Sequence, residues 1–120
     1  MSNFKNEDDF LKEIHLSNTI KGKYKFDSKR EELMDSDISK ITFENCEIHN
    51  GNFLSSIFNE CTFNKVIFRE SSLSGTIFKQ CNFIKCRFSN IEPDFDIIDS
   101  RVELLSVTKE SLETALRPWS

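Results

Sequence analysis

Large apolar side chains recur at every fifth residue along the middle of this chain. The recurring residue is Phe, Leu or Ile at eleven consecutive positions: Ile38, Phe43, Ile48, Phe53, Phe58, Phe63, Phe68, Leu73, Phe78, Phe83 and Phe88. A period of five matches neither the 3.6-residue repeat of an α-helix nor the two-residue repeat of a flat strand. It requires a chain that bends after each short extended piece.

A second column, made mostly of small side chains, runs two residues ahead of the first. It contains Ser36, Ile41, Cys46, Gly51, Ser56, Cys61, Val66, Ser71, Thr76, Cys81 and Cys86. Residues i and i+2 of an extended segment point to the same side, so both columns are expected to face inward. Four such pieces close a coil of about twenty residues, and successive coils stack as parallel strands about 4.8 Å apart.

The stretch CTFNKVIFRESSLSGTIFKQCNFIKCRFSN reads as consecutive units of the form small, any, Leu or Phe, any, any. In this pattern the chain resembles the pentapeptide-repeat family over residues 36–91. The resemblance implies an all-β fold, namely a right-handed quadrilateral parallel β-helix of about three coils with helical caps at both ends. We expect one compact domain, with an N-terminal cap over 1–35 and a C-terminal cap over 92–120.

The N-terminal flank is predicted to contain two helices and an extended entry segment. Asn6 can cap the first helix, in which Phe10, Leu11 and Ile14 form an apolar stripe. Residues 20–26 alternate roughly between apolar and polar side chains, which indicates a strand. A second, short helix is predicted from a cap at Ser28 through residue 33.

The C-terminal flank begins at Pro93, which stands where the next large central residue should be. Proline lacks an N–H, so it cannot readily occupy a ladder position. Residues 101–107 are predicted to be extended. Thr108 is predicted to cap a helix through Arg117, which would serve either as a second lid or as a dimer contact.

The net charge of −4 is distributed unevenly along the chain. Residues 1–35 contain seven basic and eight acidic groups, residues 36–91 six and five, and residues 92–120 three and seven. With no basic stripe evident, we expect no direct binding to nucleic acid and none to an anionic membrane. The longest apolar runs are far too short for a transmembrane helix.

All four cysteines fall in the small inward column, and no pair has CxxC spacing. They are predicted to be reduced and to pack as small apolar side chains, with a Cys61–Cys81 disulfide as the alternative. Residues 1–20 lack the features of a secretory signal, which together with reduced thiols predicts a cytoplasmic protein.

The sequence contains none of the short motifs that usually mark catalysis or cofactor binding. His15 and His49 do not belong to a metal-binding spacing, and there is no glycine-rich phosphate loop or nucleophile elbow. We therefore expect no enzyme activity, no cofactor and no metal.

The candidate partner-binding residues are side chains at outward positions. Leu54, Ile57 and Ile77 are apolar, and Ile57 and Ile77 are twenty residues apart and should stack on one wall. Either a flank of the chain covers this patch or it binds a partner or a second copy. Asp94, Asp96 and Asp99 belong to an acidic run that either attracts a basic partner or is a solvated loop.

The leading functional hypothesis is a non-catalytic protein-binding module. The small size of the stack favours a small bacterial or phage-type inhibitor or protective protein, of the immunity or anti-defence kind, that binds a nucleic-acid enzyme or a toxin. One alternative is a structural, scaffold or dimerisation module. A further alternative, also implied by the resemblance, is a DNA mimic that protects bacterial topoisomerases.

Overall fold

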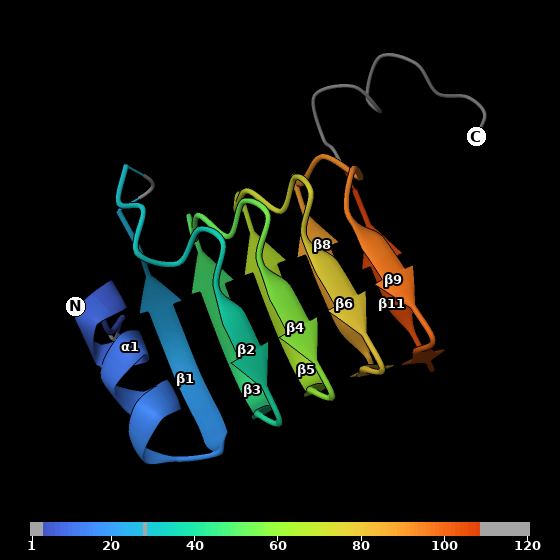
Figure 1. Cartoon of the computed structure of the whole chain (residues 1–120), viewed down its shortest axis with the longest axis horizontal. Coiled ribbons are helices and arrows are strands. Elements are labelled where there is room, and N and C mark those ends of the chain that lie inside the picture. The colour runs from blue at the N-terminus through green and yellow to red at the C-terminus, as the bar shows by residue number, and fades with distance from the viewer. Residues whose placement is uncertain (1–3, 28, 109–120) are drawn as a thin grey trace.

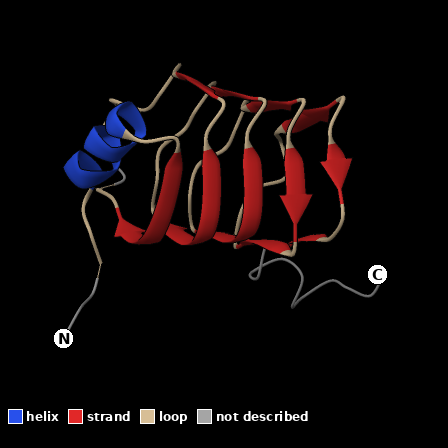
Figure 2. Cartoon of the chain, turned by 90° about the horizontal axis from the view of Figure 1, so that it is seen from below, coloured by secondary structure: helices blue, strands red, loops and turns tan. Residues whose placement is uncertain are grey.

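The computed structural model describes residues 4–27 and 29–108, which form one helix and a four-sided β-solenoid of about four turns (Figure 1). The elements are α1 (Glu7–Leu16), β1 (Thr19–Lys25), β2 (Asp37–Ser39), β3 (Thr42–His49), β4 (Ile57–Asn59), β5 (Thr62–Arg69), β6 (Ile77–Lys79), β7 (Asn82–Ile84), β8 (Cys86–Ser89), β9 (Asp96–Ile98), β10 (Arg101–Val102) and β11 (Leu105–Val107). The coils lie side by side along the long axis of the molecule, with α1 at one end (Figures 1 and 2).

All strand pairings are parallel, and they follow the repeat. β2, β4, β6 and β9 form a four-stranded sheet, and the remaining strands form a seven-stranded sheet. Phe43 of β3 lies beside Phe63 of β5, which lies beside Phe83 of β7, so the central coils are offset by twenty residues. The prediction of an all-β parallel β-helix is confirmed.

The coil bends at residues whose backbone is in the left-handed region. The non-glycine residues of this kind have φ between 47° and 62°, and they are Asp35, Lys40, Asn45, Asn50, Ser55, Glu60, Lys65, Glu70, Gln80, Lys85, Asn90 and Asp99. Gly75 adds one more corner with φ of 71°. One left-handed residue after four others therefore makes one side of the coil, which is the physical origin of the five-residue period.

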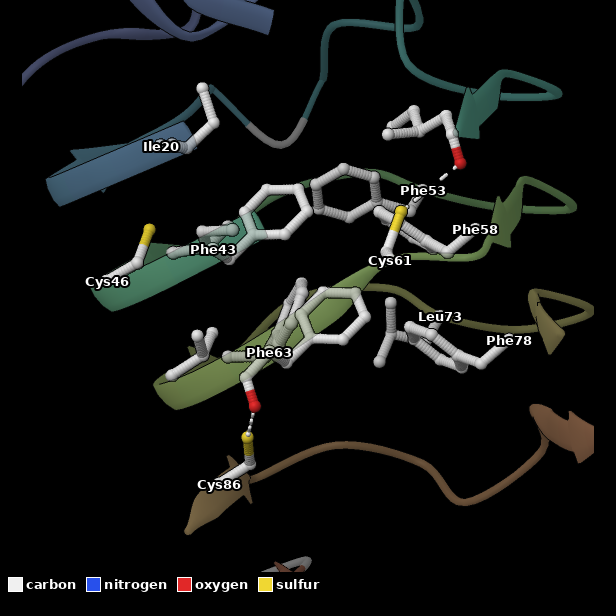
Figure 3. Packing of buried hydrophobic residues seen from close by; sticks show 14 of the residues in the cluster. Ile20, Phe43, Cys46, Phe53, Phe58, Cys61, Phe63, Leu73, Phe78 and Cys86 are labelled. Carbon is white, nitrogen blue, oxygen red and sulfur yellow. Dashed lines mark hydrogen bonds between the residues drawn. The ribbon is translucent and has the colours of Figure 1, made fainter. Parts of the chain in front are cut away.

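Phenylalanine rings fill the inside of the coil (Figure 3). Phe63 is fully buried and stacks nearly parallel on Phe43 at 4.9 Å and on Phe83 at 5.0 Å between ring centroids. Rings on adjacent sides of the coil, such as Phe58 and Phe63, meet edge to face at 5.6 Å. Both are favourable aromatic geometries, so each ring stabilises the coils above and below it.

The small side chains of the inward column leave room for the rings and also form hydrogen bonds. Thr76 Oγ1 donates to the carbonyl of Phe53 at 2.7 Å. Cys86 Sγ donates to the carbonyl of Phe63 at 3.1 Å, as Figure 3 shows. Each acceptor lies 23 residues earlier, in the preceding coil. Ser, Thr and Cys suit this column because a short side chain with a donor satisfies a buried carbonyl there.

α1 covers the N-terminal end of the ring stack, as predicted. The Asn6 side chain accepts from the Asp9 N–H at 2.9 Å, and the Asp9 carboxylate accepts from the Asn6 N–H at 3.1 Å, which completes a capping box. Phe10 is fully buried and lies against Phe43 and Phe53. In the described part of the chain, no helix has the length and apolar character needed to cross a membrane.

The predicted short helix through residue 33 is wrong for the residues that the structure describes, 29–33, while its cap Ser28 lies outside them. These residues form turns instead. The Leu33 carbonyl accepts from Ser56 Oγ at 2.5 Å, and the Arg30 carbonyl accepts from Asn52 Nδ2 at 3.2 Å. Backbone groups that a helix would use internally therefore bind the next coil.

The C-terminal flank also differs from the prediction, because residues 96–107 continue the solenoid. Phe78 lies beside Ile97, Phe83 beside Val102 and Phe88 beside Val107. The offset here is nineteen residues, because the side that contains Pro93 is one residue short. The solenoid therefore has about four turns and not about three. The helix predicted from Thr108 to Arg117 lies outside the described residues, apart from Thr108 itself.

Candidate functional site

Four of the six predicted partner-binding residues share the outer face of the four-stranded sheet. On this face β4 and β6 place Ile57 directly beside Ile77, as the twenty-residue spacing predicted. Asp37 of β2 lies beside Ile57, and Asp96 of β9 lies beside Ile77. We call this face the isoleucine wall, defined by Asp37, Ile57, Ile77, Asp96, Ile98 and Asp99.

The two isoleucines project outward from the coil and remain accessible. Ile57 is 36% exposed, and Ile77 is half-buried in the sheet beside it. α1 does not cover them, since it lies at the N-terminal end of the solenoid (Figure 1). An apolar pair between two carboxylates is therefore open to contact from outside.

Leu54 is half-buried, and its own side chain lies just before the corner that leads into the isoleucine wall. Its carbonyl accepts from the Asp35 N–H at 2.9 Å, which fixes the backbone against the preceding coil. The structure therefore places Leu54 on the rim of the wall rather than within it.

The three predicted aspartates lie near the C-terminal end of the same region, and all are exposed. Asp96 is on β9, and Asp99 forms the following corner with φ of 47°. Asp94 lies on the neighbouring side, where its carboxylate accepts from Ser74 Oγ at 2.8 Å. The structure brings Asp96 and Asp99 to the isoleucine wall and leaves Asp94 at its edge.

Two residues of the wall were missed by the sequence analysis. Asp37 is twenty residues before Ile57, so the repeat spacing alone would have placed it there. Ile98, 40% exposed, lies beside Lys79 because of the nineteen-residue offset. Counting in fives places Ile98 inward, so no signal in the period could have found it.

The four cysteines are buried and free, so the structure shows no Cys61–Cys81 disulfide. Burial raises the pKa of the Cys46 thiol to about 12, and burial also raises the pKa of Cys86. These thiols stay protonated near neutral pH and are poor nucleophiles.

Neither histidine belongs to a cluster of three metal-ligand side chains among the described residues. His49 lies 3.0 Å from the Glu47 carboxylate and packs edge to face on Phe4 at 4.8 Å, and His15 is exposed. Within residues 4–27 and 29–108, no three His, Cys, Asp or Glu side chains come together to hold a metal ion.

Comparison with known proteins agrees with the geometry of the coil. The family model of pentapeptide repeats matches residues 58–90, in 8 copies. A search of curated proteins finds no match to the chain. The matched range contains the stacked rings of β4 to β8, where the five-residue period and the left-handed corners are most regular. Residues 58–90 of this chain are therefore similar to the pentapeptide-repeat family.

Proposed function

We propose that this protein is a non-catalytic protein-binding module that uses the isoleucine wall as its contact surface. Pentapeptide-repeat proteins are often protein-binding or protective proteins. The observation that carries the proposal is the exposed Ile57–Ile77 pair between Asp37 and Asp96 on a rigid parallel sheet. Apolar side chains with charged residues around them are typical of protein interfaces.

The partner that suits this wall is a protein with apolar side chains and basic residues around them. Asp96 and Asp99, with Asp94 at the edge, give the C-terminal part of the wall a negative charge that would attract basic groups. A protective or inhibitory protein directed at a nucleic-acid enzyme fits this surface, because the nucleic-acid site of such an enzyme is basic.

The test compares two double variants in a pull-down from the native host, with bound proteins identified by mass. Ile57→Glu with Ile77→Glu changes the wall, and Asn64→Glu with Ile84→Glu adds two glutamates on adjacent rungs of another side. We expect the partner to be captured by the wild type and by the second variant but not by the first. All four side chains point outward, so circular dichroism should show both variants folded.

Capture of the same partner by the wall variant would overturn the proposal. Unfolding of the wall variant alone would also overturn it, since it would mean that the isoleucines support the fold from within rather than a contact.

A dimerisation module is the second candidate function, and the last turn of the solenoid favours it. Val102, Leu104 and Val107 are 47%, 58% and 38% exposed, so an apolar end is accessible among the described residues. Sedimentation equilibrium should then give twice the chain mass, and Leu104→Glu should return the monomer. A monomer at the highest soluble concentration would exclude it.

The DNA-mimic hypothesis has a separate test, which is a topoisomerase supercoiling assay with and without a poison. Protection by added protein, lost when Asp96 and Asp99 are replaced by Asn, would support mimicry. No effect at micromolar protein would exclude it.

A further inference from the structure

The structure gathers basic side chains on the side of the coil opposite the isoleucine wall. Charges counted along the chain show no basic stripe, but the coil brings basic groups from separate strands onto one side. The second halves of β1, β3 and β5, together with β8, present outward columns in which Lys23, Glu47, Ile67 and Arg87 are neighbours, as are Lys25, His49 and Arg69. Lys65 and Lys85 form the adjoining corners. We call this surface the basic wall, defined by Lys23, Lys25, Lys65, Arg69, Lys85 and Arg87.

A hollow lies near the C-terminal end of the basic wall. It has a volume of about 410 Å³, and its lining includes Lys65, Lys85, Arg87, Ile67 and Leu104. Three cationic groups thus surround two apolar side chains, one of which, Leu104, is 58% exposed.

The cations of this hollow are not neutralised by the part of the chain that the structure describes. Among residues 4–27 and 29–108, Lys65, Lys85 and Arg87 form no ion pair within 4.0 Å. Lys40, at the corner that follows β2, by contrast lies 4.0 Å from Glu60. An unpaired cluster of positive charge beside accessible apolar groups favours an anionic partner that also has an apolar side chain.

We propose that this hollow is a docking site for an acidic protein segment that carries an apolar side chain. Carboxylates would pair with Lys65, Lys85 and the fork of Arg87, and the apolar side chain would contact Ile67 and Leu104. This site is independent of the isoleucine wall, because it lies on a different side of the coil and selects a partner of opposite charge.

Nucleic acid fits the hollow less well. Ile67 and Leu104 offer nothing to a phosphate, and Glu47 and the corner residue Glu70 place negative charge within or beside the basic wall. Strong binding to duplex DNA draws on about 6–10 phosphate contacts, which is more than three cations around one hollow supply.

The binding test measures fluorescence anisotropy of three labelled probes at about 50 mM salt, where screening is modest. The probes are a short glutamate peptide with two central leucines, the same peptide with glycines in place of the leucines, and a short DNA duplex. We expect the wild type to bind the leucine peptide most tightly, with a dissociation constant in the micromolar range.

The double variant Lys85→Glu with Arg87→Glu should weaken binding of the leucine peptide at least about tenfold, because each reversed charge repels carboxylates. The matched control is Lys40→Glu with Lys79→Glu. It makes the same change in net charge, at one left-handed corner and one outward strand position, beside the isoleucine wall. Leu104→Gln should weaken binding of the leucine peptide without weakening binding of the glycine peptide.

Four results would overturn the proposal. They are no binding of the leucine peptide, equal losses in both double variants, equal affinity for the leucine and glycine peptides, or tighter binding of the duplex that is lost in Lys85→Glu with Arg87→Glu. The last result would assign the basic wall to nucleic acid. The unfolding midpoints of all variants are measured alongside. Unchanged midpoints would show that a loss of binding comes from the altered surface and not from unfolding.

Discussion

At the scale of single residues, the fold depends on corner residues and on inward residues, which contribute unequally to stability. Corner residues such as Lys65 and Gln80 have φ of 58° and 54°, a conformation that costs L-residues roughly 1 kcal/mol each. The chain uses Lys, Glu and Gln there, and the burial of the inward rings must offset that cost. The inward residues therefore dominate stability, and most outward side chains are free to vary.

Phe63→Ala is expected to lower the free energy of unfolding by about 3–5 kcal/mol, because it leaves a cavity between Phe43 and Phe83. A small domain has about 5–15 kcal/mol in total, so the variant should be near unfolding. Lys65→Ala, at an exposed corner two residues later, should change stability by under about 0.5 kcal/mol. Urea unfolding measures both, and similar effects at the two positions would contradict the assignment of inward and outward columns.

At the scale of elements, α1 is held to the coil by polar contacts around its first turn. Arg30 Nη2 lies 3.0 Å from Asp8, and Arg30 Nε lies 3.8 Å from Glu7 and 3.0 Å from Glu32. The side chain of Glu7 is only 4% exposed. Burial raises the pKa of Glu7 above its ordinary value of 4.5, against the opposing charge of Arg30, and Glu32, Asp8 and Asp27 add to the rise.

Glu7→Gln is expected to become more stable relative to the wild type as the pH rises above 4.5. Below that pH, Glu7 is protonated in both states. Above it, unfolded Glu7 ionises while folded Glu7 keeps its proton up to the raised pKa, so wild-type stability falls across this window. Gln does not titrate. Urea unfolding of both proteins from about pH 4 to about pH 7 measures the difference. A constant difference would show that the attraction of Arg30 balances the effect of burial, and a difference that favours the wild type at higher pH would show that it outweighs burial; either result contradicts the prediction.

Most elements could be predicted from the sequence, because the signals that define them are local. The period of five predicts the central coils, and Asn6 with its acidic first turn predicts α1. The turn at 29–35 could not be predicted, because its backbone groups are satisfied by Asn52 and Ser56 in the next coil. The last coil was missed because the side before Phe95 is one residue short. This shift moves Ile97, Val102 and Val107 out of the five-residue register of the central coils.

The candidate surfaces could be predicted only in part. The Ile57–Ile77 pair follows directly from the twenty-residue spacing. The basic wall does not follow from charges counted along the chain, because its lysines and arginines come from three strands and one corner and are diluted in the sequence by acidic groups of other walls. Counting charge by column rather than by segment would have found it.

At the scale of the whole molecule, the two ends of the stack differ. Phe10 of α1 closes the N-terminal end, where the Phe43 and Phe53 rings would otherwise be exposed. At the other end, Phe95 covers Phe78 and Phe88 with ring centroids 5.9 and 5.2 Å apart. The side before Phe95 is one residue short, so Phe95 occupies the position that Thr76 holds in the previous coil. From this position its ring can reach both Phe78 and Phe88.

The position of the missing residue leads to a prediction about insertions. One Asn inserted between Asp94 and Phe95 would restore a side of full length, and Asp94 could still accept from Gly75 and Ser74. This side is at the edge of the described stack, where an extra residue can bulge without breaking a second ladder. We expect the free energy of unfolding to change by under about 1 kcal/mol.

The same insertion one coil earlier, between Ser74 and Gly75, should cost more than about 2 kcal/mol. That side is bonded on both edges, because Ser72 and Ser74 accept from Phe53 and Ser55 while Gly75 donates to Asp94. An extra residue there must break one ladder or the other and move Thr76 off the Phe53 carbonyl. Thermal and urea unfolding of the two insertion variants measures the contrast. If both insertions cost the same, the register of each coil is set by its own corners rather than by the coils on either side of it.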